Sequence, residues 1–152
     1  MNVRRVNKWV TFGNVGVLAG ISLLVFELGQ TREMTRAQTR SEVAAQIVDL
    51  LRDVSTDPQL ADVMGRAHAG EELTAAENRQ FRHRSLAMLR YFENVHYQYR
   101  QGLYAESEFT TQEEAWRGFM TAGGYEAVWC SMRETFSVEF RTAFDRLLPH
   151  GC

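Results

Sequence analysis

Apolar positions along the chain fall into two patterns. The first is a nearly continuous apolar run over residues 9–28, which reads WVTFGNVGVLAGISLLVFEL and contains a single charge, Glu27. Beyond it, apolar residues recur every three or four positions, as on one face of a helix, and no segment shows convincing period-two alternation. The pattern predicts an all-α chain.

The apolar run is long enough to cross a bilayer, because a helix of ~20 residues spans a hydrocarbon core of ~30 Å. Basic residues and Trp9 precede it, as is typical of a membrane interface. A cleaved signal peptide normally has a shorter apolar region that ends in small residues, whereas this run ends in Phe26, Glu27 and Leu28. We therefore expect an uncleaved transmembrane helix over 9–28, after a basic tail over 1–8.

One face of this predicted span carries glycine. Gly13, Gly16 and Gly20 share that face at helical spacing, and Gly16 and Gly20 form a GxxxG pair, which lets two helix backbones approach closely. Asn14 is a polar residue inside the span, and such residues usually bond to a neighbouring helix. These residues predict association with a second copy or with a partner membrane protein.

The remainder of the chain predicts a neck helix over 29–55, continuous with the span, and a compact helical bundle over 56–152. Asp57, before Pro58, and Ser137 are predicted N-caps that mark helix starts, and glycine, as in the pair at 123–124, or proline marks helix ends. Capping boxes at Thr74 and Glu77, and at Thr110 and Thr111, open two of the helices. The expected helices are 59–68, 74–101, from 110 or 111 to about 122, 125–134, and 137–149.

The densest chemical stretch is RYFENVHYQYR, residues 90–100. It belongs to a stripe at helical spacing that predicts the buried face of a central helix, formed by Phe81, Ser85, Leu89, Phe92, His96, Tyr99 and Leu103. Glu93 and His96 form an E-x-x-H pair, but di-metal bundles need two such pairs and two more carboxylates, and this chain has one. We expect no bound metal or cofactor. A small pocket is the alternative, formed by Glu93, His96, Tyr97, Tyr99, Arg100 and Trp129.

The composition and the motifs argue against two classes of function, nucleic-acid binding and catalysis. The formal net charge is −2 and the pI is near 6.1, so no basic field for nucleic acid exists. The basic run from Arg79 to Arg84 predicts a solvated helix face. No catalytic fingerprint is present. Of the two cysteines, Cys130 is expected to be a buried, inert thiol and Cys152 a mobile terminal residue. A disulfide between them is the alternative, without positive support in the sequence.

Several segments together resemble a group of uncharacterised bacterial membrane-anchored proteins. They are the apolar span followed by FELGQTREMTRAQTR, the stretch YFENVHYQYRQGLYAESEF, and Trp129-Cys130. The resemblance implies a single-pass protein of the bacterial inner membrane and no known activity. In that group the segment after the span is the richer in arginine, which implies a cytoplasmic domain. Here three basic residues on each side balance, so the charges themselves give no direction.

The leading hypothesis is a non-enzymatic, membrane-anchored helical protein that self-associates or binds a partner in the lipid bilayer. The first alternative is a ligand- or metal-binding domain that uses Glu93 and His96. The second is a small homo-oligomeric pore lined by Thr11, Asn14 and Ser22, which lie on one polar face of the span.

Overall fold

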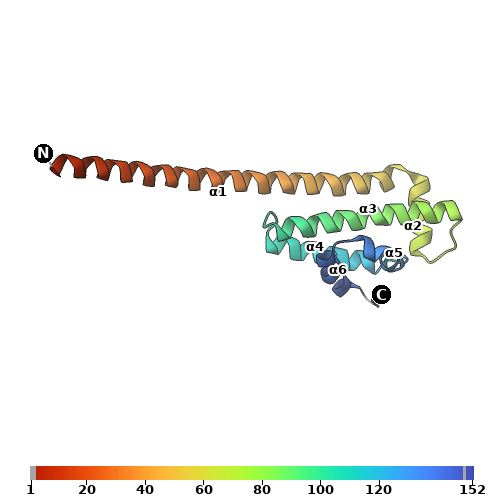
Figure 1. Ribbon diagram of the computed structural model, residues 1–152. Helices are drawn as coiled ribbons and strands as arrows, with labels where there is room; N and C mark the ends of the chain where they lie inside the picture. The colour runs from red at the N-terminus through yellow and green to blue at the C-terminus, as the bar shows by residue number, and fades with distance from the viewer. Residues whose placement is uncertain (1–2, 149) are drawn as a thin grey trace. The chain divides into compact units, whose positions relative to one another are not determined.

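The computed structural model describes the backbone of residues 3–148 and 150–152, and the side chains of residues 16–148 and 150–152. In this part of the chain all regular structure is helical, which confirms the all-α prediction (Figure 1). The helices are α1 (Val3–Thr56), α2 (Pro58–His68), α3 (Ala75–Arg100), α4 (Glu106–Met120), α5 (Tyr125–Met132) and α6 (Val138–Phe144), with short 3-10 helices η1 (Arg133–Thr135) and η2 (Asp145–Leu147).

The chain divides into two compact units, residues 1–38 and 39–152. The first unit contributes only the beginning of α1. The end of α1 belongs to the second unit, because Thr39 and Val43 are buried there. The compact domain therefore starts at Thr39 and not at residue 56, where the sequence placed its boundary.

The predicted transmembrane segment is described only in part. Residues 9–15, which include Gly13 and Asn14, lie outside the residues whose side chains are described. In the described residues, 16–148 and 150–152, no helix has a stretch with the length and apolarity needed to cross a membrane. The apolar side chains from Val17 to Leu28 that the structure describes are exposed. The transmembrane assignment stays a prediction.

Two helix starts follow the predicted capping chemistry. Asp57 precedes α2, and its Oδ1 accepts from the backbone N–H groups of Gln59 and Leu60 at 2.9 and 3.1 Å. Thr74 and Glu77 form the reciprocal capping box before α3, with Glu77 Oε2 accepting from the Thr74 amide at 2.8 Å. These side chains satisfy amides that the first helical turn leaves unpaired.

The start of α4 differs from the prediction. The helix begins at Glu106, so Thr110 and Thr111 lie inside it and do not cap it. Their hydroxyls donate to the carbonyls of Glu106 and Ser107, one turn back, at 2.9 and 3.0 Å. A threonine within a helix commonly bonds in this way, which makes the same residues compatible with both an N-cap and an interior position.

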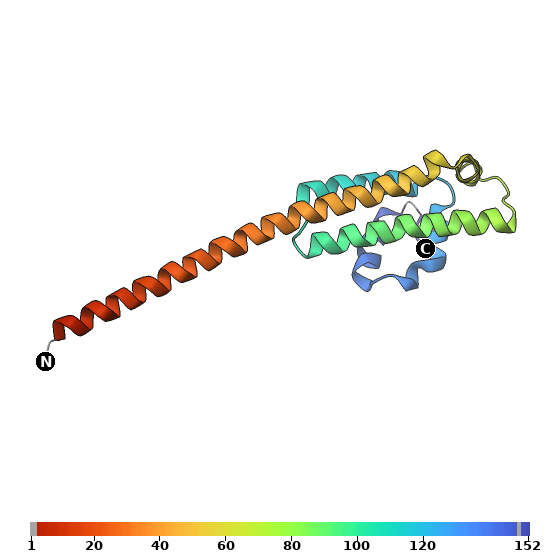
Figure 2. The ribbon, with the colours of Figure 1, turned by 90° about the horizontal axis from the view of Figure 1, so that it is seen from above.

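Helix α3 is the centre of the compact domain. It contacts α2, α4, α5 and α6, which gather around it in Figures 1 and 2. In the predicted stripe Phe81, Ser85, Leu89, Phe92 and His96 are buried, which agrees with the interpretation of α3 as a central helix, whereas Tyr99 and Leu103 at its end are half-buried. The full set of buried residues on α3 is Phe81, Ser85, Met88, Leu89, Tyr91, Phe92, Val95 and His96.

Aromatic rings from α4 and α6 meet the middle of α3, and a ring of α5 packs against them. The ring of Phe92 stacks on Trp116 of α4, with centroids 4.8 Å apart, and meets Phe119 edge-on at 5.5 Å. Phe144 of α6 lies 5.9 Å from the same ring and 4.6 Å from Trp129 of α5. Because large rings bury much apolar area, this cluster supplies much of the cohesion between the helices.

We predict that Phe92→Ala lowers the free energy of unfolding by about 3–5 kcal/mol, because it leaves a cavity where the ring is only 3% exposed. Tyr97→Ala, on the same helix but 54% exposed, is the matched control and should change it by less than about 0.5 kcal/mol. Denaturant titration followed by tryptophan fluorescence measures both. Equal effects of the two substitutions would contradict the burial of Phe92.

Candidate functional site

The structure assigns Glu93 a local structural contact. Its Oε1 accepts from the backbone N–H of Ser137 at 2.8 Å, at the start of α6, and its Oε2 accepts from Arg90 Nη1 at 2.6 Å. Burial acts to raise the pKa of Glu93, but the hydrogen bonds from Ser137 and Arg90 outweigh it and hold that pKa below its ordinary value. Glu93 is therefore an ionised cap for α6, a task that the sequence assigned to the Ser137 hydroxyl.

His96 lies in the aromatic core of the domain. Its ring centroid is 6.0 Å from that of Phe109 on α4 and 5.7 Å from that of Phe140 on α6. Burial, and to a lesser extent the cationic Arg100, lower the pKa of His96, so the imidazole is neutral at neutral pH. Among the described residues no group of three or more His, Cys, Asp or Glu side chains is arranged to hold a metal ion.

The other four residues of the predicted pocket lie in different surroundings. Tyr97 is 54% exposed, whereas Tyr99 stacks on Phe109 with ring centroids 4.0 Å apart. Arg100 reaches Glu139 on α6 at 3.4 Å. Trp129 is fully buried on α5. The structure brings Glu93, His96 and Arg100 to the junction of α3 with α6.

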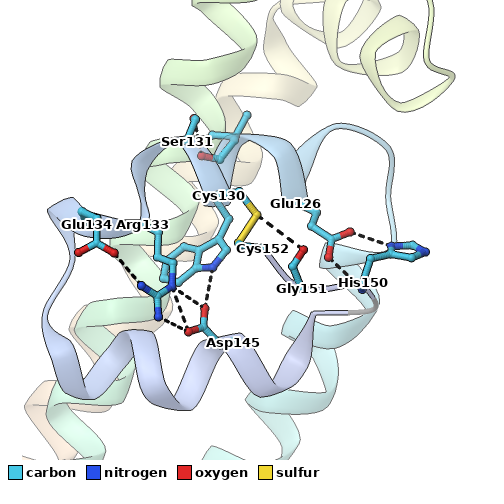
Figure 3. Close-up of a disulfide and its surroundings, with 11 residues drawn as sticks. Glu126, Cys130, Ser131, Arg133, Glu134, Asp145, His150, Gly151 and Cys152 are labelled. Carbon is cyan, nitrogen blue, oxygen red and sulfur yellow. Dashed lines mark hydrogen bonds and ion pairs between the residues drawn. A yellow bond between two sulfur atoms is a disulfide. The ribbon is translucent and has the colours of Figure 1, made fainter.

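Asp145 organises a polar cluster that sequence reasoning missed (Figure 3). Its Oδ1 accepts from Trp129 Nε1 at 3.1 Å, and its two carboxylate oxygens accept from Arg133 Nε and Nη2 at distances from 2.5 to 3.1 Å. The hydrogen bond from Arg133 is the main cause that lowers the pKa of Asp145. The paired guanidinium and carboxylate join the start of η1, directly after α5, to η2, and no spacing in the sequence marks them.

The two cysteines form a disulfide, so the expectation of an inert thiol at Cys130 and a mobile Cys152 is wrong (Figure 3). Their Cα atoms lie 5.4 Å apart, and the bond closes a sequence separation of 22 residues. His150 supports the same arrangement, because its amide and its Nδ1 contact the two carboxylate oxygens of Glu126 at 3.0 and 2.9 Å. The chain after η2 returns to α5, which a helical pattern does not predict.

The basic run on α3 divides into different environments. Arg82 Nη2 donates to Ser131 Oγ at 3.3 Å, as a partly solvated side chain. Arg84 instead points inward, and its Nη2 donates to the Leu50 carbonyl of α1. Its Nε and Nη1 atoms are buried without a partner among the described residues, and burial lowers the pKa of Arg84. The prediction of a uniformly solvated face is wrong at this residue.

A cavity of about 360 Å³ lies among the loop after α2, the start of α3 and the start of α5. Its wall includes Phe81 and Val128, which are buried, and its rim carries Glu71, Glu72 and Arg82. Its size falls in the range of small-molecule pockets, about 300–1,000 Å³, but its polar groups are exposed at the rim and do not converge. The sequence marked only the glycine pair at 123–124 beside it, as a helix end.

In the predicted span, the description covers Gly16, Gly20 and Ser22. Nothing in the described structure approaches the position that a Cβ atom would take at either glycine within 4 Å. The Ser22 hydroxyl donates to the Leu18 carbonyl of its own helix at 2.9 Å, so it has an intrahelical partner. Thr11, Asn14 and Gly13 lie outside the described side chains.

Comparison of the chain with protein-family models, curated proteins and solved structures finds no match. The resemblance to the bacterial membrane-anchored group therefore stays a prediction.

We predict that the stability contributed by Glu93 depends on pH. Its pKa is below the ordinary value of 4.5 in the folded chain, so its contribution is complete above pH 4.5 and is lost as the pH falls below that value through the folded pKa. Glu93→Gln should flatten this part of the curve of unfolding free energy against pH. Glu72→Gln, in the exposed loop before α3, is the control and should leave the curve unchanged. Identical curves for wild type and Glu93→Gln would rule out the cap.

Proposed function

We propose that this protein is a non-enzymatic, single-pass protein of a bacterial inner membrane that self-associates through its anchor and holds a helical domain on the non-cytoplasmic side. The observation that carries the proposal is the disulfide between Cys130 and Cys152, in a chain whose residues 9–28 form an apolar segment. Membrane attachment itself rests on the sequence of residues 9–28.

The sidedness follows from redox chemistry. Disulfides form and persist in oxidising compartments such as the bacterial periplasm, and they are rare in the cytosol, where thiols are kept reduced. Cys130 and Cys152 are both bonded, and the tail that carries Cys152 also contacts Glu126 through His150. The balanced basic residues around the span do not oppose this orientation. The proposal therefore replaces the cytoplasmic orientation that the family resemblance implied.

A non-catalytic role is supported by how the reactive side chains are used. Glu93 caps α6, Arg100 pairs with Glu139, and the Trp129 indole donates to Asp145. Each contact joins two elements of the domain, so each polar group already has a structural partner. These contacts support a domain that acts by binding through its surface and not by catalysis at an internal site.

Self-association through the anchor is supported by the glycine pair. Gly16 and Gly20 have open space around them in the described structure, and nothing of the chain's own fold fills it. In a bilayer, packing between helices depends on close backbone approach, because lipid supplies no hydrophobic drive for association. The GxxxG pair therefore allows the helix of a second copy to approach closely.

We predict that the double substitution Gly16→Leu, Gly20→Leu lowers the dimer fraction in chemical cross-linking of native membranes, because two added side chains separate the helices. Val17→Leu, Ile21→Leu has the same spacing on a neighbouring face and is the matched control. The control should assemble like wild type. Unchanged assembly of the glycine variant would remove the anchor from the interface.

We predict that both cysteines are oxidised in intact cells and become reactive from the periplasmic side after reduction. A membrane-impermeant maleimide applied to spheroplasts should label neither cysteine before reduction and both after an impermeant phosphine. Cys130→Ser frees Cys152 and should be labelled without reduction, which controls for access. Labelling of the wild-type thiols only after lysis, with no reduction needed, would place the domain in the cytoplasm and overturn the proposed sidedness.

A further inference from the structure

The end of α1 carries an exposed stripe that the compact domain does not use. Its residues are spaced three and four apart in alternation. They are Ser41, Ala44, Val48, Leu51 and Ser55. All five are exposed, including the two large apolar side chains, Val48 at 50% and Leu51 at 57%. In the part of α1 that belongs to the compact domain, the other large apolar side chains, Val43, Ile47, Leu50 and Val54, are buried or half-buried, so this exposed pair requires an explanation.

The stripe is separate from the face that packs on the domain. Val43 is buried, and Ile47, Leu50 and Val54 pack against the core at half-buried positions. At 3.6 residues per turn, the two stripes lie about 110° apart around the helix axis. Helix α1 therefore has one apolar face for its own domain and a second beside it, and half-exposed Ile47 and Val54 lie along the border.

The spacing of the exposed stripe is that of a helix that pairs with another helix. A strict seven-residue repeat drifts around a straight helix of 3.6 residues per turn, and supercoiling with a partner helix keeps such a stripe in contact. In this repeat Val48 takes an a position and Leu51 a d position. A β-branched residue at a with leucine at d favours a parallel two-stranded arrangement.

The charged residues that flank the stripe allow α1 of a second copy to pack in parallel. In that arrangement a g residue faces the e residue five positions later on the partner helix. Arg40 would then face Ala45, and Ile47 would face Arg52, so no like charges meet. The two arginines already have partners within the chain, since Arg40 lies 3.1 Å from Glu108 and Arg52 lies 2.8 Å from Asp49.

We infer that the stripe from Ser41 to Ser55 is a homodimer contact, in which α1 of one copy packs in parallel and in register against α1 of a second copy. The inference rests on the proposed membrane anchor, which holds two copies in the same orientation and raises their effective concentration. A short stripe with only two large apolar residues per copy needs such confinement to pair.

The contact is distinct from the glycine pair in the span. In sequence, the same spacing runs back from Ser41 through Met34 to Glu27 and then to Gly20. Two Glu27 carboxylates that face each other would oppose pairing at that level. The pairing of α1 in the compact domain is therefore a separate contact, and it can be tested independently of the anchor.

Single cysteines introduced along α1 of the full-length protein in native membranes test the inference. The background carries Cys130→Ser and Cys152→Ser. Val48→Cys and Leu51→Cys should form disulfide-linked dimers on mild oxidation, because identical a and d positions meet across a parallel pair. Asp49→Cys and Asp53→Cys, exposed but off the stripe, are the matched controls and should stay monomeric. Val48→Arg should reduce the dimer formed by Leu51→Cys.

Each outcome decides between contacts. Cross-links at 48 and 51 with none at 49 and 53 support the inferred dimer. Cross-links at Gly16→Cys but at none of the four α1 positions overturn it and leave association through the anchor standing. Equal cross-linking at all four positions shows collision without a register and overturns it as well. A cross-linked species that contains this chain and a different protein shows that the stripe binds another partner, and it overturns the homodimer.

Discussion

Burial of α3 on several sides is the constraint on which the rest of the compact domain depends. An exposed aromatic stripe on a helix of this length would be costly, and the shorter helices α2, α4, α5 and α6 each cover a part of it. Phe92 at its middle contacts rings from α4 and α6, and His96 further along lies between two more. Two polar side chains of the same helix then bind the start of α6. Glu93 accepts a hydrogen bond from the Ser137 amide, and Arg100 pairs with Glu139.

This order of causes explains what the sequence predicted well. Helical periodicity identified the buried face of α3, and the capping residues Asp57 and Thr74 marked two helix starts, because both signals act within one or two turns. The same local logic failed at Thr110 and Thr111, whose hydroxyls bond equally well inside a helix. Local chemistry was ambiguous there, and the position of α4 is set by its rings against α3.

Contacts between segments that are distant along the chain could not be predicted from a single sequence. Glu93 and Ser137 are separated by 44 residues, and Trp129 and Asp145 by 16. The pairing of the two cysteines is of the same kind, since it depends on where the chain after η2 travels. The residue types of the E-x-x-H pair at Glu93 match those of metal ligands, which made Glu93 and His96 weak metal candidates although the chain has only one such pair. The structure shows that the carboxylate faces an amide and a guanidinium, so residue type alone did not indicate its partner.

The tethered tail has a mechanical consequence. With Cys152 bonded to Cys130, residues 130–152 form a covalent ring that joins α5 to the segment after η2. Because this ring contains η1, α6 and η2, a force that pulls α6 away from α5 can extend the chain only as far as the closed ring allows, and the two cysteines separate only when the bond is reduced.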